Sequence, residues 1–301
     1  MVHGETSRNW SFRQPDQQKI TYDPGLTRHP DGLSTRTRSI VVIAGKNMKA
    51  FVTGGSGYLG RNLLSALLKD NYQLSVLSQN INEDLTIGKV AFAHPAAIAI
   101  SLVPQFFAPY THSKVIAEQL VLSANLASGS CLSTVVVRPR LVWGKDDTVM
   151  LPAVIKAISA GFYGWFTPTY MTSTCHVTNC IECLCLAATK GRPGEVYFVT
   201  DGVQSPFQEF MTRLLVIHGV AVPARTVPFS VAWKIATILE HIPFLHWGKQ
   251  HEAGLTRQVL SVLGREVTLS DAKAREQLGY VGHVTMEQGM YEMQQLLAVK
   301  E

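Results

Sequence analysis

Three glycines at regular spacing are the first residues in this chain that could do chemistry. Gly54, Gly57 and Gly60 follow the apolar segment that includes Phe51 and Val52, and they lead into a run of leucines at helical spacing. A strand, a glycine turn and a helix in this order form a phosphate cradle. Glycine allows the tight turn, and the helix amino terminus attracts the anion. A glycine triplet alone is a weak signal, but these flanking segments favour a pyrophosphate-binding turn.

A tyrosine and a lysine form the second candidate site. Tyr110 and Lys114 open a predicted helix that continues to Leu122, so their side chains share one helix face. A neighbouring ammonium group stabilises the phenolate and lowers the tyrosine pKa from its usual value of about 10. An isolated pair of this spacing is usually a surface feature. The glycine turn upstream and the run Val135-Val136-Val137-Arg138-Pro139 downstream favour the catalytic interpretation.

Four segments carry a resemblance to a known family: TGGSGYLG, YTHSK, VVVRPRLVWG and GEVYFVTDG. They resemble the extended short-chain dehydrogenase/reductase superfamily. Within it, the chain is similar from about residue 48 onward to the branch of 3β-hydroxysteroid dehydrogenase and sterol-4α-carboxylate 3-dehydrogenase. The resemblance implies an NAD(P)-dependent oxidoreductase acting on CH–OH groups in steroid metabolism. Two alternatives stay open: a dinucleotide-binding or interaction protein without catalysis, and a nucleotide-sugar epimerase or dehydratase.

The resemblance also assigns roles to individual residues. Tyr110 would exchange the proton of the substrate hydroxyl, and Lys114 would bind the nicotinamide ribose. Pro139 and Val142 would lie beside the nicotinamide ring, which is the part of the cofactor that carries the hydride. The implied cofactor-binding residues are Gly54, Gly57, Tyr58, Leu59, Gly60, Ser78, Gln79, Tyr110, Lys114, Pro139 and Val142.

The preference between NAD and NADP depends on the residues after the second strand of the fold. A carboxylate there would bind the ribose 2′-hydroxyl of NAD, and an arginine would accept the phosphate of NADP. This chain has Ser78 and Gln79 at these positions, and both side chains are neutral. Both cofactors therefore remain candidates.

The interval before Tyr110 is short for the expected fold. The second strand is predicted at 73–78, and Tyr110 follows about thirty residues later. A doubly wound sheet would need roughly 70 residues there for three more strands and their helices. Residues 90–92 or 98–103 could fill one place. The prediction is therefore a Rossmann-like sheet that is incomplete.

The family also places a serine or threonine hydroxyl beside the reacting carbonyl. By spacing, Ile87 would occupy that position, and it has no hydrogen-bond donor. Thr86 could replace it after a shift of one residue, and Ser101 is a second candidate. The predicted catalytic residues are Tyr110, Lys114 and Thr86, while the absence of any competent hydroxyl stays open.

The predicted organisation is an α/β Rossmann-like doubly wound parallel sheet with a smaller C-terminal substrate-binding region. Residues 1–47 are expected to form a disordered or irregular leader. Residues 48–145 with part of 174–200 would form the dinucleotide-binding domain. Residues 146–173 and 201–301 would bind the substrate. The first 49 residues carry a net charge of +4 against +5 for the whole chain, so the remainder is almost neutral and does not indicate nucleic-acid binding.

Four of the five cysteines cluster between Cys175 and Cys185. Cys180, Cys183 and Cys185 cannot all face one point on a helix, and paired C-x-x-C knuckles are absent. Buried reduced thiols in an intracellular protein are therefore preferred over a metal site.

The segment Phe229–Trp247 is the most apolar long stretch. Lys234, Glu240 and Pro243 interrupt it, which disfavours a spanning helix. It could be a lid over an apolar alcohol or ketone substrate, a peripheral contact with a membrane, or ordinary packing. The apolar segment of a secretory signal is not found at the start of the sequence, which favours a cytoplasmic protein. If the segment Phe229–Trp247 contacts a membrane, we expect the protein to lie peripherally at an intracellular membrane. A homodimer also stays open.

Overall fold

The computed structural model divides the chain into two compact units, residues 1–36 and residues 37–301. It describes residues 11–13, 19–21, 42–45, 49–53, 57–77, 91–93, 109–125, 133–241 and 256–298. In the first unit, β1 (Ser11–Arg13) pairs antiparallel with β2 (Lys19–Thr21). The expected leader therefore contains a hairpin, and its last residues belong to the second unit.

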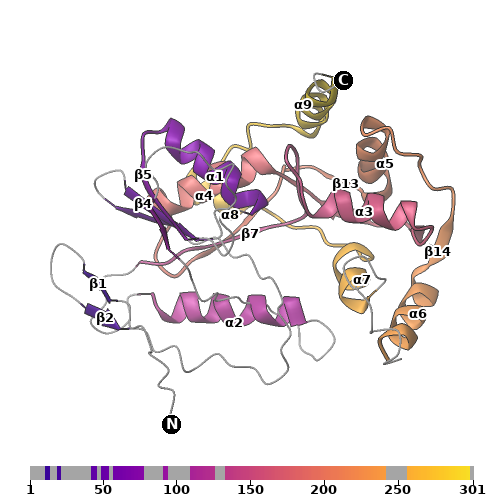
Figure 1. The fold of residues 1–301 in the computed structure, drawn as a ribbon, viewed down its shortest axis with the longest axis horizontal. Helices are drawn as coiled ribbons and strands as arrows, with labels where there is room; N and C mark the ends of the chain where they lie inside the picture. The colour runs from indigo at the N-terminus through magenta and orange to yellow at the C-terminus, as the bar shows by residue number, and fades with distance from the viewer. Residues whose placement is uncertain are drawn as a thin grey trace, which may run out of the picture. The chain divides into compact units, whose positions relative to one another are not determined.

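The strands of a four-stranded sheet lie before and after the glycine turn in the sequence (Figure 1). Its order is β3 (Val42–Gly45), β4 (Lys49–Thr53), β5 (Gln73–Leu77) and β6 (Ala91–Ala93). β4, β5 and β6 are parallel, whereas β3 is antiparallel to β4. The strand predicted at 73–78 is confirmed. The segment at 90–92 contributes to β6, and residues 98–103 lie outside the described part of the chain.

Two further strand pairs follow α2. β7 (Val136–Pro139) pairs in parallel with β12 (Val196–Val199), and β8 (Val142–Trp143) pairs in parallel with β11 (Cys175–His176). Between β5 and α2 the described residues contain β6 alone. Parallel strands alternating with helices confirm the α/β Rossmann-like fold, and the described sheet has fewer strands than a complete doubly wound one.

Nine helices lie in the described residues: α1 (Tyr58–Lys69), α2 (Pro109–Ser123), α3 (Met150–Ser159), α4 (Val177–Lys190), α5 (Phe207–Ile217), α6 (Phe229–His241), α7 (Arg257–Leu263), α8 (Ala272–Leu278) and α9 (Met286–Ala298). α1 buries Leu63 and Leu67, which repeat at helical spacing, against Val52 of β4 and Ile181 of α4. α2 contacts β7. These contacts position the elements on which the candidate site lies.

The C-terminal region has its own core. Its strands are β9 (Trp165–Thr167), β10 (Met171–Ser173), β13 (Gln204–Pro206) and β14 (Thr226–Pro228). Trp143, Trp165 and Phe210 are fully or almost fully buried there, together with residues of α3, α5 and α9. Thr285 and Gln288 form a capping box at the start of the last helix, because they exchange side-chain to backbone hydrogen bonds of 2.9 and 3.2 Å. None of the helices that the structure describes is long and apolar enough to cross a membrane.

Candidate active site

The glycine turn leads from β4 into the amino terminus of α1. Gly57 is the N-cap residue, and both Gly57 and Gly60 are buried. No side chain caps this helix end, and its first turn has no acidic residue. The positive end of the helix dipole therefore meets no carboxylate from its own first turn, which suits an anionic ligand. Gly54 lies outside the described residues.

Tyr58 places a hydroxyl at the start of α1. Its oxygen is buried and has no hydrogen-bond partner among the described residues. Burial raises the pKa of Tyr58 far above its ordinary value, with a smaller contribution from Asp147, so the phenol stays protonated. A buried hydroxyl without a hydrogen-bond partner destabilises the folded state unless a ligand or a water molecule binds it. Its position beside the turn fits a polar group of a cofactor. Leu59 is half-buried and packs against a core formed by residues of α4, β12 and α8.

Tyr110 and Lys114 both lie in the first half of α2, one helical turn apart. Lys114 is half-buried, and burial lowers the pKa of its ammonium group. One turn further on, Glu118 forms a bidentate ion pair with Arg138 of β7, in which Arg138 Nε donates to Glu118 Oε2 at 2.6 Å. Paired guanidinium and carboxylate groups are rigid, so this contact fixes α2 relative to the end of β7.

Pro139 and Val142 flank the turn between β7 and β8, and both are half-buried. Between them, Leu141 has a φ of +47°, in the left-handed region that leucine rarely adopts. Val142 pairs with Cys175, and Trp143 pairs with His176. The turn that would face the nicotinamide is therefore strained and held by a neighbouring strand.

The structure brings some of the predicted site residues together and leaves others undescribed. Tyr110 and Lys114 share α2, and the Glu118–Arg138 pair connects that helix to the strand ending at Pro139. The residues Gly54, Ser78, Gln79, Thr86 and Ser101 lie outside the described part of the chain, so their roles remain predictions.

Sequence reasoning missed three residues around this site: Glu118, Leu141 and Asp201. Asp201 lies in the segment GEVYFVTDG, which contributed to the resemblance but was given no role. The position of Glu118 one turn after Lys114 was visible, whereas its partner Arg138 follows 20 residues later. The strain at Leu141 has no signal in the sequence.

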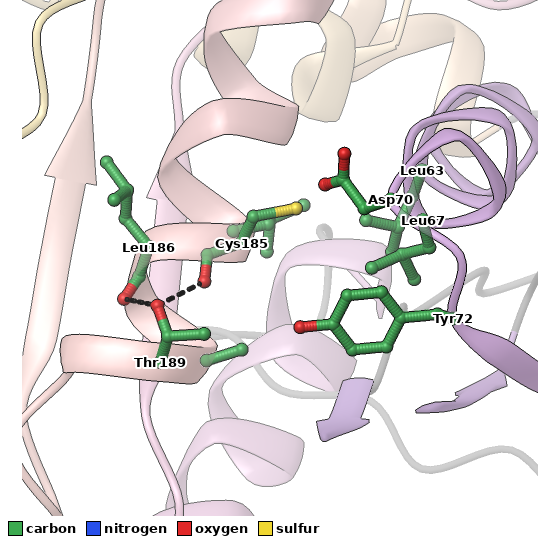
Figure 2. Close-up of a pocket in the computed structure, with 9 residues that line it drawn as sticks. Leu63, Leu67, Asp70, Tyr72, Cys185, Leu186 and Thr189 are labelled. Carbon is green, nitrogen blue, oxygen red and sulfur yellow. Dashed lines mark hydrogen bonds between the residues drawn. The ribbon is translucent and has the colours of Figure 1, made fainter. Parts of the chain in front are cut away.

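A small apolar cavity of about 160 Å³ lies away from these residues, between α1 and α4 (Figure 2). It is lined by the middle and carboxyl end of α1 and by Tyr72, Cys185 and Thr189. The Thr189 hydroxyl donates to backbone oxygens within α4. Burial raises the pKa of Cys185 to about 11, so its thiol is not a nucleophile at neutral pH. The cavity is too small for a dinucleotide, and we interpret it as imperfect helix packing.

The clustered cysteines are free thiols in the structure. Cys175, Cys180 and Cys183 are fully buried, and burial raises the pKa of Cys183 to about 12. Among the described residues, no group of three or more His, Cys, Asp or Glu side chains is placed to hold a metal ion. These thiols contribute to the core beneath α4.

A parallel sheet, a glycine turn at a helix amino terminus and a Tyr/Lys pair on one helix define a dinucleotide-binding type of α/β protein. The model of the 3-beta hydroxysteroid dehydrogenase/isomerase family matches residues 98–230. A ketoreductase of 4-hydroxy-2-methyl-3-oxo-4-farnesyl-3,4-dihydroquinoline-1-oxide from Stigmatella aurantiaca is 34% identical over 329 aligned positions, which cover 82% of this chain and 96% of the relative. The chain belongs to the 3-beta hydroxysteroid dehydrogenase/isomerase family, within the extended short-chain dehydrogenases/reductases. The recognition made from the sequence motifs is confirmed.

Other relatives match over less of their length. A 2-alkyl-3-oxoalkanoate reductase from Stenotrophomonas maltophilia is 32% identical over 62% of this chain, and the match spans 57% of that enzyme. Among solved structures, the enzyme WbmF of Bordetella bronchiseptica in complex with NAD+ is similar with a TM-score of 0.56 and 16% identity, covering 82% of this chain and 92% of WbmF. This structural similarity supports the Rossmann-like fold.

Proposed function

We propose that this protein is an NAD(P)-dependent oxidoreductase that interconverts a ketone and a secondary alcohol. The observation that carries the proposal is the arrangement of Tyr110 and Lys114 on one turn of α2, connected through Glu118 and Arg138 to the strand that ends at Pro139. In this arrangement a phenol and an ammonium group can act together at one reacting oxygen. Membership of a family of dehydrogenases and reductases supports it.

The described residues fit a dinucleotide. The uncapped end of α1 and the unpartnered hydroxyl of Tyr58 offer hydrogen-bond donors where its phosphates would bind. When bound, the nicotinamide cofactor supplies or accepts the hydride. Ser78 and Gln79 would contact the adenosine ribose, and NAD and NADP both remain candidates; WbmF is described with NAD+.

The proposed residues of this chain then move and position the proton. Tyr110 donates its phenolic proton to the carbonyl oxygen during reduction and takes it back during oxidation. Lys114 favours the phenolate by its charge and hydrogen-bonds the ribose. Thr86 remains the proposed donor that polarises the carbonyl. Pro139 and Val142 would exclude water from one side of the nicotinamide.

For the substrate we propose an apolar ketone whose neighbouring carbon carries a large substituent. The names of two relatives describe such molecules, a 3-oxo compound with a farnesyl group and a 2-alkyl-3-oxoalkanoate. The 3β-hydroxysteroid of the family description is also a secondary alcohol on a large apolar molecule, although its hydroxyl carbon does not require a substituted neighbour. A pocket for these molecules would be mainly apolar, with few polar groups at the reacting carbon.

The test is a titration of the purified full chain with NADH and NADPH, followed by turnover on 2-alkyl-3-oxoalkanoates and 3-oxosteroids. Tyr110→Phe should still bind the nucleotide but lose about 10²- to 10⁴-fold in kcat. Tyr291→Phe is the matched control, because Tyr291 is an exposed tyrosine on α9. Full activity of Tyr110→Phe would refute the assignment.

A second candidate is a protein that binds the nucleotide without turnover. The alignment with the Stigmatella ketoreductase has 329 positions, more than the 301 residues of this chain, so it contains gaps opposite this chain. This supports the proposal that a segment is lacking between β5 and α2, where the family has further strands. Binding of NADH with no reduction of any ketone would favour this candidate.

We also propose that α6 makes a peripheral contact with an anionic intracellular membrane. The helix buries its small residues Ala232 and Ala236 against α7, while Val231, Ile235 and Ile238 are exposed, Ile238 by 60%. Exposed Lys234 on the same helix suits anionic headgroups.

Its test is sedimentation with phosphatidylglycerol vesicles and with phosphatidylcholine vesicles. Ile235→Gln together with Ile238→Gln should abolish binding to the anionic vesicles, whereas Val216→Gln on α5 should not. Equal binding of both variants would contradict the contact.

A further inference from the structure

The carboxylate of Asp201 accepts four hydrogen bonds in the described structure. Oδ2 accepts from the Trp143 indole and from the Thr174 hydroxyl, each at 2.8 Å. Oδ1 accepts from the His176 backbone N–H at 2.6 Å and from the Asn179 amide at 2.8 Å. All four donor residues are completely buried. Only an ionised carboxylate offers acceptor sites for four donors, so an amide could not replace it without leaving buried groups unpaired.

One of these bonds reaches the turn beside the proposed nicotinamide site. Trp143 follows Val142 directly, and its ring is fixed by Asp201 on one edge and packed against His176 and Phe210 on others. On the other side of the turn, the Cys175 N–H donates to the Leu141 carbonyl at 3.3 Å. Both contacts lie on the carboxyl side of the Leu141 N–Cα bond, whose φ is +47°.

A leucine in the left-handed region is strained and persists only where its surroundings enforce that conformation. The described contacts beside it are the β8–β11 pairing, the bond from Trp143 to Asp201, the bond from the Arg140 guanidinium to the Val262 carbonyl, and the packing of Leu141 against the C-terminal core. Relaxation of Leu141 would rotate the peptide groups on both sides of it. Pro139 and Val142 would then move relative to each other.

We propose that Asp201 is a positioning residue for the cofactor. By fixing Trp143 it keeps Leu141 in the strained conformation, and this conformation orients Pro139 and Val142 toward the nicotinamide. The inference rests on the proposed function. It differs from a purely structural role because it predicts an effect on nucleotide binding that depends on the strain at residue 141.

The experiment measures NADH and NADPH affinity, KM and kcat separately, and thermal unfolding of the full chain. Asp201→Asn should lower kcat/KM by about 10- to 100-fold and weaken nucleotide binding, because a small misplacement of the nicotinamide ring lowers the reaction rate. The matched control is Asp271→Asn. Asp271 is a buried carboxylate bound to Thr200 and Arg275 and has no contact with the turn. It should lower the Tm and leave nucleotide affinity unchanged.

Leu141→Gly provides the decisive comparison, because glycine adopts a positive φ without strain. In the Asp201→Asn background it should restore part of the lost affinity, so that the two changes are not additive. Equal affinity of Asp201→Asn and the unchanged protein, or additive losses in the double variant, would overturn the inference. If the unchanged protein binds neither NADH nor NADPH, the proposed function fails instead.

Discussion

Burial and the neighbouring carboxylates have opposite effects on the pKa of His176. Its Nδ1 accepts a 3.3 Å hydrogen bond from the Thr178 N–H and so caps α4, which leaves the proton on Nε2. Nε2 is 3.6 Å from a Glu292 carboxylate oxygen and has no hydrogen-bond partner among the described residues. Burial lowers the pKa of His176, although Glu292 and Asp201 favour the charged form and Lys145 opposes it. The neutral imidazole is therefore the form that the fold stabilises.

This predicts a loss of stability in mild acid. Because the folded pKa is below the unfolded value of about 6.5, the unfolded chain binds the proton first as the pH falls. The stability contribution is complete above pH ~6.5 and decreases as the pH falls toward the folded pKa. Thermal unfolding at pH 7.5 and pH 5.5 should show a larger drop in Tm for the unchanged protein than for His176→Asn, which keeps a capping side chain but does not titrate. Parallel drops for both proteins would show that other groups cause the acid sensitivity.

At the scale of elements, α4 holds the connection between α8 and α9. The Glu182 carboxylate accepts from the backbone N–H groups of Val281 and Gly282 at 3.0 and 3.1 Å. Asn179 both donates to and accepts from the backbone of Val284, at 2.7 and 2.9 Å. Two polar side chains one turn apart on α4 thus satisfy the backbone of a segment about a hundred residues later.

We therefore expect Glu182→Gln to loosen α9 selectively. The amide cannot accept at both of its terminal atoms, so at least one backbone donor loses its partner at a cost of about 1–2 kcal/mol. Hydrogen exchange should become faster in residues 281–298, while α1 and β4 keep their protection. Glu276→Gln on α8 is the control, because that side chain is exposed. Uniform acceleration over the whole second unit would contradict this selective effect.

Local patterns predicted α1, α2 and the strand at 73–78. The leucine spacing of α1 and the Thr-x-x-Gln spacing of the capping box can be seen in the sequence, because each depends on residues within a few positions. The network around Asp201 was not visible, because its donors lie 22 to 58 residues away and only the fold brings them together. The same holds for the Glu118–Arg138 pair. Side chains that act through distant partners leave no periodic signal in one sequence.

For the whole second unit, the place of β3 in the sheet is the most unusual feature. β4 and β5 correspond to the first two strands of a doubly wound sheet. In such a sheet the first strand lies between the second strand and a strand from later in the chain. Here that place is taken by Val42–Gly45, which precede β4 and run antiparallel to it. A segment assigned from the sequence to a disordered or irregular leader thus supplies the edge strand beside β4, the strand that leads to the glycine turn.

Breaking this strand should weaken both stability and nucleotide binding. Ile43→Pro removes a backbone donor from the strand paired with Phe51, and we expect the Tm to fall by roughly 5–10 °C. NADH affinity should fall with it, since β4 carries the turn. Ile20→Pro in β2 makes the same change in the first unit and should leave the NADH affinity unchanged. Equal effects of the two prolines on binding would mean that β3 has no special part in supporting the turn.

The neighbouring positions of β3 and β4 in the sequence also bear on the order in which the sheet assembles. Only three residues separate these strands, whereas 19 residues separate β4 from its other neighbour, β5. Short loops close quickly and at a small entropic cost, so the hairpin is the contact that can form first as the chain leaves the ribosome. β4 would then be paired with β3 long before the C-terminal half of the chain has been synthesised.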